Sequence, residues 1–358
     1  MLANRAILMI ALGSLIALNG LATFAAPGQT QETLFSALPL EAPAPADNPT
    51  TRLRVELGRL LFWDPILSGT GDVACATCHH PDFGYADGRD LPIGVGGTGL
   101  AHARRFSSAG GRRLVKRNSQ SLLNVAFNGW TDARPFPPGA APMFWDVRAR
   151  GLEAQALVPI ENIDEMRGDG VTASRGVATA VSRLAANAEY AGLFANAFGG
   201  SSPVSDENLG RALAAFQRTL ITPQSPFDRF QRGDRTAMTD AQQRGMEQFL
   251  RAGCAECHAG PMFSDYKVHT LGTPGNPKLT DPDSGVAGTY GFRTPTLRNL
   301  ALTAPYMHNG VFQTLDEVVT FYLDLQRRRP GRPRHAAVKD DMLAPLQIGV
   351  TSWRFSVP

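Results

Sequence analysis

Several features are scarce in this sequence of 358 residues. The formal net charge is only +3, which excludes a strong electrostatic attraction to nucleic acid. After the first 25 residues, no segment is long and apolar enough to cross a membrane. No sustained alternation of apolar and polar residues indicates a sheet. Cysteine is limited to four residues, and all four belong to two short motifs, so none is left over for other chemistry.

The two motifs have the form Cys-x-x-Cys-His, which is the attachment signature of a c-type haem. Two thiols three residues apart can project from one side of a helical turn and add to the two vinyl groups of a haem. The adjacent histidine then reaches the iron as its proximal ligand. The sequence therefore predicts two covalent haems, bound by Cys75, Cys78 and His79 and by Cys254, Cys257 and His258.

Two other interpretations of the motifs are less favoured. Zinc sites usually pair two Cys-x-x-Cys knuckles or add a second histidine, and four thiols with two histidines would over-supply one tetrahedral ion. A thioredoxin-like redox pair needs a strand–helix setting, which is not evident around either motif. Haem attachment remains the prediction.

The N-terminus has the layout of a secretory signal peptide. Arg5 precedes an apolar run from Ala6 to Leu18, and small residues follow at positions 23–26. We expect residues 1–25 to be a signal peptide and residues 26–48, rich in Ala, Pro, Gln and Thr, to be a flexible leader. A retained membrane anchor is the alternative. Because covalent haem attachment takes place outside the bacterial cytoplasm, we expect a periplasmic protein without stable membrane insertion after signal cleavage.

The remaining chain, of about 310 residues, fits two domains of ordinary size, with one haem motif in each half. We expect an N-terminal haem domain over residues 49–220 and a C-terminal haem domain over residues 221–358. Apolar residues at three-to-four spacing predict helices over residues 49–61, 175–187, 189–198 and 206–220.

Polar residues mark where several helices should begin. Asn48 is the expected cap of the first helix. Thr239 with Gln242, and Thr314 with Glu317, form capping-box patterns ahead of two more helices. By contrast, residues 67–128 are rich in glycine and turns, and we expect them to wrap around a large prosthetic group. The predicted fold class is mostly α with little β structure.

Three further segments resemble the bacterial di-haem cytochrome c peroxidases. They are the Leu-Phe-Trp-Asp-Pro string within residues 61–68, the Phe-Trp-Asp run continuing to Glu-Met over residues 144–166, and the Pro-Tyr-Met-His-Asn-Gly region within residues 295–310. The match covers about residues 50–325. The resemblance implies two cytochrome c-like domains, each holding one covalent haem, with one calcium ion between them.

The resemblance also implies roles around the first haem. Val95 stands where other members have a distal histidine, so this haem should be open to hydrogen peroxide unless His80 or His102 substitutes. Glu165 matches the distal glutamate that carries a proton between the peroxide oxygens, and Gln155 matches a nearby pocket glutamine. A solvated helix-end acid is the ordinary alternative for the glutamate.

Two further sites are implied between the haems. Trp145 matches a tryptophan that relays charge between them, although a core tryptophan would fit the same segment. The calcium ligands would be the side chain of Asn118 and the carbonyls of Thr303 and Pro305, with water completing an oxygen shell. These assignments depend entirely on the resemblance.

The sixth ligand of the second haem decides between branches of the family. Many members have a methionine fourteen residues after the histidine of the Pro-Tyr-x-His-x-Gly motif, and this chain has Tyr322 there, fourteen residues after His308. An inward tyrosine that bonds a carbonyl is the alternative. A tyrosine ligand carries negative charge and stabilises oxidised iron, whereas a thioether raises the haem potential.

Tyrosine ligation is the pattern of the MauG-type branch. There, peroxide drives both haems to Fe(IV), and the pair oxidises Trp or Tyr residues of a partner protein. One departure is Ala252, which replaces a surface tryptophan used by that branch for charge transfer, and the basic loop over residues 101–116 is at most a docking site for an acidic partner.

Three functions remain open at this point. The favoured one is a periplasmic, MauG-like oxidase that uses hydrogen peroxide to modify a protein substrate. The alternative is a cytochrome c peroxidase that reduces peroxide to water with electrons from a small cytochrome c or cupredoxin. A non-enzymatic di-haem electron carrier would need both irons six-coordinate, which Val95 disfavours.

Overall fold

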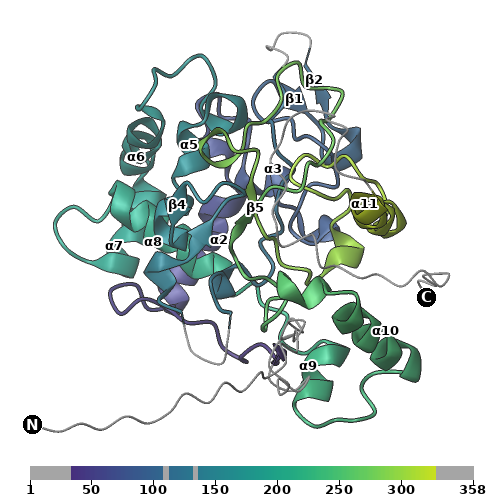
Figure 1. The fold of residues 1–358 in the computed structure, drawn as a ribbon. Coiled ribbons are helices and arrows are strands. Elements are labelled where there is room, and N and C mark those ends of the chain that lie inside the picture. The colour runs from purple at the N-terminus through teal and green to yellow at the C-terminus, as the bar shows by residue number, and fades with distance from the viewer. Residues whose placement is uncertain (1–33, 108–112, 132–135, 328–358) are drawn as a thin grey trace, which may run out of the picture.

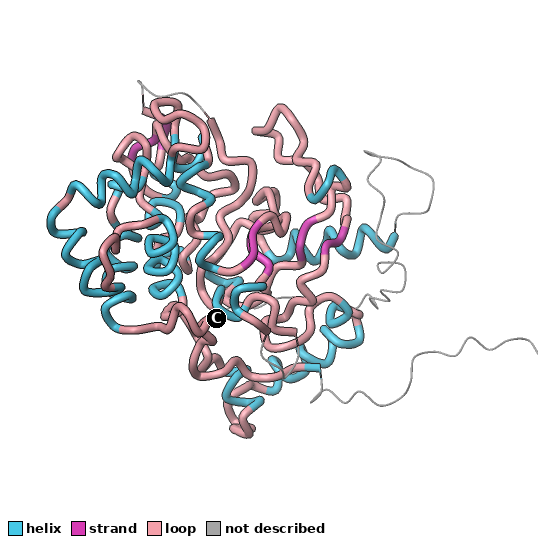
Figure 2. The backbone as a smooth tube through the Cα atoms, turned by 90° about the vertical axis from the view of Figure 1, so that its left-hand side faces the viewer, coloured by secondary structure: helices cyan, strands magenta, loops and turns pink. Residues whose placement is uncertain are grey.

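The computed structural model describes residues 34–107, 113–131 and 136–327. Helices and loops dominate these residues, and the only sheets among them are three two-stranded antiparallel ribbons. Figure 2 shows how short the strands are and how much of the backbone is loop. The prediction of a mostly α fold with little β structure is therefore confirmed. The expected signal peptide, residues 1–25, lies outside the described residues.

Four helices form the core of the N-terminal half and lie together on the left of Figure 1. Helices α2 and α8 pack very closely where Gly58 faces Ala212. The absence of a side chain at Gly58 allows this approach, because a Cβ atom there would collide with the carbonyl oxygen of Ala212. Leu57, Leu61 and Phe62 bury the inner face of α2. The four helices are α2 (Arg52–Trp63), α6 (Gly176–Ala186), α7 (Ala188–Phe198) and α8 (Asp206–Gln217).

The predicted helices agree with the structure except at the first N-terminus. We expected Asn48 to cap a helix from residue 49, but α2 begins at Arg52 and Thr51 is its cap. Asn48 is instead fully buried, and its amide nitrogen donates to Glu153 Oε1 and to the Arg211 carbonyl. The long-range bonds therefore outcompete the local cap at this position.

Both predicted capping boxes are confirmed. Gln242 N donates to Thr239 Oγ1 while Thr239 N donates to Gln242 Oε1, and α10 (Asp240–Arg251) follows. Thr314 and Glu317 bond in the same reciprocal way ahead of α11 (Leu315–Arg327). With α9 (Pro226–Gln231), these helices lie on the right of Figure 1.

The division into domains at residues 220 and 221 stays a prediction.

Short elements connect the two groups of helices. In the N-terminal half they are η1 (Pro65–Leu67), α3 (Cys75–Cys78), η2 (Pro81–Phe83), β1 (Gly97–Thr98), η3 (Ala101–Ala103), β2 (Arg105–Phe106) and η4 (Val125–Phe127). Then follow η5 (Pro138–Ala140), β3 (Pro142–Met143), β4 (Ala149–Arg150), α4 (Leu152–Gln155), α5 (Val158–Glu161) and η6 (Ile163–Arg167), which is a π-helical turn. In the C-terminal half they are η7 (Cys254–Glu256), β5 (Val268–His269), η8 (Val286–Gly288), β6 (Phe292–Arg293) and η9 (Leu300–Leu302).

Residues 34–48 are packed against the rest of the protein. We expected them to belong to a flexible leader over residues 26–48, and for this part the prediction was wrong. Phe35 and Leu38 are buried. The Leu34 carbonyl accepts a hydrogen bond from Gly260 N at 2.9 Å, close to the second Cys-x-x-Cys-His motif. The apolar side chains of this segment are too sparse to predict a helix. They are nevertheless buried against parts of the protein that are distant in the sequence.

Candidate functional site

One cavity of about 690 Å³ connects the two Cys-x-x-Cys-His motifs. Cavities of this size that are walled mainly by apolar side chains are where proteins hold organic ligands. Segments from both halves of the chain line it, including all the cysteines and both motif histidines. The further candidate residues in its wall are Asn118, Trp145, Gln155, Glu165, Thr303, Pro305 and Tyr322. The structure thus brings together every site residue that the sequence singled out for chemistry.

The first motif forms a single helical turn, α3, as predicted. Ala74 N donates to Thr77 Oγ1 at 3.0 Å, which begins the turn, and His79 N donates to the Cys75 carbonyl at 3.0 Å, which closes it. Both thiols are free, and burial raises the pKa of the Cys75 thiol to about 12. Neither thiol is used in a disulfide, so both are available for attachment to the vinyl groups of a haem.

His79 is held with one ring nitrogen available. Its Nδ1 lies 3.0 Å from the Tyr85 carbonyl oxygen, and because a carbonyl can only accept, Nδ1 carries the hydrogen. Such a bond fixes the tautomer and the ring orientation of a metal-ligating histidine. Nε2 is then the atom with a free lone pair. Burial is the main cause that lowers the pKa of His79, so the neutral, ligating form is favoured.

The second motif repeats this arrangement on a tighter turn. Cys254–Glu256 is a 3₁₀ turn, whereas the first motif forms an α-helical one, and His258 N donates to the Cys254 carbonyl at 2.9 Å. His258 Nδ1 bonds the Phe263 carbonyl at 2.8 Å. Both thiols are free here as well. The two halves therefore offer the same donor set: two thiols and one histidine with Nε2 unoccupied by the chain.

Glu165 lies in the cavity wall on the π-helical turn η6, a kind of irregularity that often occurs at functional sites. Asn162 Nδ2 donates to Glu165 Oε1 at 2.8 Å. Burial is the main cause that raises the pKa of the Glu165 carboxyl, and Asp164 adds to it. A half-buried, oriented carboxyl facing a cavity does not fit the alternative of a solvated helix-end acid.

The glycine-rich loop is held against this turn. Val95 N donates to the Glu165 carbonyl at 3.0 Å, and a Cβ atom added at Gly94 would collide with the same oxygen. The Val95 side chain packs against the core instead of lining the cavity, where Pro92 and Val115 are found. The loop therefore places apolar side chains, and no histidine, in the cavity wall.

Neither proposed substitute for a distal histidine reaches the cavity. The ring of His80 packs against Trp63, and its Nδ1 accepts from Asp82 N at 3.3 Å. His102 packs against Phe83. Among the described residues, only His79, His258, His269 and His308 line the cavity, so neither His80 nor His102 does.

Trp145 and Asn118 form the middle of the cavity wall. Trp145 is only 9% exposed, and its Nε1 donates to the Asn118 carbonyl at 3.0 Å. Asn118 N donates to the His308 carbonyl at 2.8 Å, so the asparagine backbone bridges the tryptophan and the Pro-Tyr-Met-His segment. Asn118 Nδ2 donates to the Arg89 carbonyl at 2.7 Å, which orients the amide and leaves its oxygen end for another partner.

Tyr322 projects from α11 into the cavity that holds the second motif. Burial is the main cause that raises the pKa of its phenol, and the neighbouring Cys257 and Cys254 contribute in the same direction. Within the part of the chain that the structure describes, its hydroxyl has no hydrogen-bond partner. The alternative expectation, a tyrosine that bonds a carbonyl, therefore has no support in this structure.

Comparison with known proteins identifies the family. Residues 52–236 match the family model for di-haem cytochrome c peroxidase. The chain belongs to this family. It is accordingly a haem-dependent oxidoreductase of the peroxidase type.

Relatives of the protein carry two different names within this family. The chain is 37% identical over 298 residues to the methylamine utilization protein MauG of Methylorubrum extorquens, covering 82% of this chain and 75% of that protein. It is 33% identical over 297 residues to the cytochrome c551 peroxidase of Pseudomonas aeruginosa, covering 80% and 76%. A solved MauG-like protein associated with microbial copper homeostasis superposes with a TM-score of 0.67 at 28% identity, covering 86% and 89%.

The residues present fit the two haems that the family implies. Each motif offers two free thiols beside a histidine whose Nδ1 is bonded, and the shared cavity is long enough to reach both. The one cluster of metal-ligating groups found among the described residues is Cys257, Asp265 and His269. Its thiol belongs to the second motif, and His269 Nε2 already pairs with Asp265 Oδ2 at 2.9 Å, so we assign no separate metal there.

Two arginines of this family member shape the site in ways that the sequence did not reveal. Arg117 pairs with Asp146 at 2.6 Å and with Asp283 at 2.6 Å, beside His308. Arg104, which we expected among solvated residues of a basic loop, is buried and donates to the Ile93 and Gly94 carbonyls, both at 2.6 Å. No short-range pattern signals either role, because the partners are distant or are backbone atoms.

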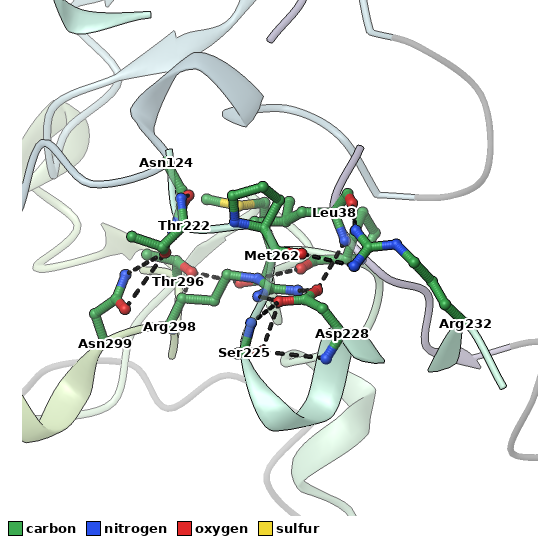
Figure 3. Close-up of polar contacts among 12 residues, drawn as sticks. Leu38, Asn124, Thr222, Ser225, Asp228, Arg232, Met262, Thr296, Arg298 and Asn299 are labelled. Atoms are coloured by element: carbon green, nitrogen blue, oxygen red, sulfur yellow. Dashed lines mark hydrogen bonds and ion pairs between the residues drawn. The ribbon is translucent and has the colours of Figure 1, made fainter. Parts of the chain in front are cut away.

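A buried ion pair supports the loop behind the second motif. Figure 3 shows Arg298 joined to Asp228, with both nitrogen–oxygen distances at 2.9 Å. Arg298 Nε also donates to the Pro261 carbonyl at 2.6 Å, and Leu38 N donates to Asp228 Oδ1 at 2.9 Å. The ring of Phe35 packs 5.3 Å from that of Phe263, whose carbonyl orients His258. Residues 34–38 therefore brace the segment that holds the second proximal histidine.

Proposed function

We propose that this protein is a MauG-like di-haem oxidase, exported to the periplasm, that uses hydrogen peroxide to oxidise Trp or Tyr residues of a partner protein. The observation that carries the proposal is Tyr322. Its hydroxyl lies in the cavity of the second motif without a hydrogen-bond partner among the described residues, at the position where a methionine is expected in a cytochrome c peroxidase. The export is inferred from residues 1–25, and no described helix is long and apolar enough to cross a membrane.

Two covalent haems would supply peroxide cleavage and the storage of oxidising equivalents. The Nε2 atoms of His79 and His258 would hold the two irons. Tyr322 would also hold the second iron through its phenolate oxygen, whose negative charge would stabilise the oxidised state. Near the first motif, the apolar wall at Pro92 and Val115 offers no ligand and would leave room for peroxide.

Glu165 would move the proton that peroxide cleavage requires. Its carboxylate could accept a proton from one peroxide oxygen and return it to the other, while the haem would supply the cleavage of the oxygen–oxygen bond. Asn162 holds the carboxylate in place, and the raised pKa brings the carboxyl closer to neutral pH, where proton transfer in both directions is easiest. Gln155 would orient the bound peroxide from the same wall.

The middle of the cavity would serve charge transfer and structure. Trp145 would relay charge between the two sites, since its indole is buried and held by the Asn118 carbonyl. Asn118, Thr303 and Pro305 would hold one calcium ion through oxygen atoms. Their presence in one cavity wall supports this assignment.

A cytochrome c peroxidase is the second candidate function. The observation in its favour is Ala252, which is only 7% exposed and stands where the MauG-type branch uses a surface tryptophan. Without that side chain, charge cannot leave the second haem by the same route. Under this candidate function, a small cytochrome c or cupredoxin would supply two electrons for each peroxide.

Peroxide titration of the purified ferric holoprotein separates the two functions. We expect one equivalent of hydrogen peroxide to change the absorption spectrum of both haems without prior reduction, and the product to decay slowly. We also expect slow oxidation of added ferrocytochrome c. A protein that ignores peroxide until half-reduced, and that then oxidises ferrocytochrome c rapidly, would support the peroxidase and refute the MauG-like proposal.

A further inference from the structure

Arg104 is a buried arginine whose guanidinium is bonded to backbone oxygens. Only 4% of the residue is exposed. Its Nε donates to the Ile93 carbonyl at 2.6 Å, its Nη2 to the Gly94 carbonyl at 2.6 Å and its Nη1 to the Gly99 carbonyl at 2.9 Å. Within the described part of the chain, no carboxylate pairs with this guanidinium. A buried charge is costly unless its donors are satisfied, so these bonds hold the guanidinium and the loop over residues 93–99 to each other.

The loop is folded back on Arg104. Its strand β1 pairs with β2, and β2 begins directly after this arginine (Figure 1). A Cβ atom added at Gly97 would lie 2.9 Å from Arg104 Nε, so the guanidinium packs directly against this glycine. The bonds to Ile93 and Gly99 join the two ends of the loop. A single side chain therefore fixes the conformation of the whole loop.

The other side of the loop lies against the turn that carries Glu165. A Cβ atom added at Gly94 would lie only 2.2 Å from the Asp164 carbonyl oxygen and 2.3 Å from that of Glu165, so the two backbones meet without a side chain between them. Val95 N donates to the Glu165 carbonyl at 3.0 Å. The loop therefore sets the backbone position of Glu165, while Asn162 orients the carboxyl group.

We propose that Arg104 is a positioning residue that holds the Glu165 carboxyl at the first haem site through this loop. Arg104 does not line the cavity, so it acts on the site only through the backbone that it binds. A reacting group must be held within about 0.5 Å of its productive position. The planar guanidinium binds several oxygens at once, which a lysine ammonium does less well. The inference rests on the proposed role of Glu165 in peroxide cleavage, and it applies to either of the two functions.

The first test removes the three bonds. In Arg104→Met, we expect kcat for peroxide turnover by the holoprotein to fall by about 10–10²-fold with little change in KM, because a misplaced carboxyl slows the chemical step. Arg104→Lys keeps the charge but satisfies fewer carbonyls, so its kcat should lie between those of Arg104→Met and the native protein.

The next residue provides a matched control for this variant. Arg105 is exposed, and its guanidinium bonds the carbonyls of His102 and Arg104 but none in the loop over residues 93–99. Arg105→Met should therefore keep the native kcat. Native turnover in Arg104→Met, or equal losses in the two methionine variants, would overturn the proposal.

A second variant disturbs the same contact and leaves the buried arginine in place. The methyl group of Gly94→Ala would push the loop away from the Glu165 turn, so we expect a similar loss of kcat. A Cβ atom at Gly170 would meet nothing within 4 Å, so Gly170→Ala should keep the native rate. Soret absorption and thermal unfolding report the haem content and the fold of each variant. A native rate in Gly94→Ala would count against the loop as the support of Glu165.

A double variant shows whether Arg104 acts through Glu165. If it does, Arg104→Met has no carboxyl left to misplace in a Glu165→Gln background, so the double variant should turn over peroxide as fast as Glu165→Gln alone. Losses that multiply would show that Arg104 acts elsewhere, which overturns this inference and leaves the role of Glu165 intact. Native turnover in Glu165→Gln alone would instead refute that role, and the inference with it.

Discussion

Replacing Glu165 with glutamine should reduce peroxide turnover by about 10²–10⁴-fold while both haems stay attached. Glutamine keeps the shape of the side chain and the contact with Asn162 but cannot carry a proton. The measurement is the rate of peroxide consumption by the holoprotein, with haem content determined from the absorption spectrum. The loss should fall on the chemical step, so peroxide binding should change little.

The neighbouring residue provides a matched control for this variant. Asp164 lies on the same π-helical turn but does not line the cavity, so Asp164→Asn should turn over peroxide nearly as fast as the native protein. Equal losses in both variants would indicate a disturbed turn instead of a lost proton carrier. A native rate in Glu165→Gln would refute the assigned role.

The acid side of the pH profile should report the same carboxyl. Glu165 acts as a base only when deprotonated, and burial raises its pKa above the ordinary 4.5 of a glutamate. Turnover should therefore fall as the pH drops through this raised pKa, earlier than an exposed carboxyl would allow. The fall should vanish in Glu165→Gln because the residual activity no longer depends on this group.

Replacing Tyr322 with methionine should raise the reduction potential of the second haem by on the order of 0.1 V or more. The change removes an oxygen ligand with negative charge and introduces a neutral thioether, so the reduced iron gains stability relative to the oxidised iron. Spectroelectrochemical titration of each haem measures the shift. The variant should also need prior reduction before it reacts with peroxide.

Tyr306 is a suitable control for the tyrosine substitution. It lines the same cavity, but its hydroxyl donates to the Leu300 carbonyl at 3.0 Å. Tyr306→Phe should therefore leave both potentials close to those of the native protein. If Tyr322→Met behaved in the same way, the tyrosine would be an ordinary wall residue and not a ligand.

The haem attachment sites could be predicted from the sequence because their chemistry depends on spacing along the chain. Two cysteines and a histidine within five residues are close enough to bind one haem, and the structure places both sets in one cavity. Glu165 and Tyr322, which the family resemblance singled out, line the same cavity, and their roles stay predictions. In these cases the local segment carries the signal.

The support around the site could not be predicted in the same way. Arg117 and Asp283 are 166 residues apart in the chain, and Arg298 and Asp228 are 70 apart, so no local pattern indicates these ion pairs. In the sequence, Arg104 is one of several basic residues in a loop. Its partners are backbone carbonyl oxygens, which every residue has, so the sequence does not identify them. Burial of such charges follows from the tertiary fold, where their hydrogen bonds replace water.

We expect the first iron to have no sixth ligand from the protein and the second iron to be bound by Tyr322. Low-temperature electron paramagnetic resonance of the ferric holoprotein tests this difference directly. We predict a high-spin signal from an open first haem, together with a six-coordinate signal from the second haem that changes in Tyr322→Met. A spectrum with only low-spin signals, unaffected by that substitution, would show that both irons are closed by other ligands and would contradict the account.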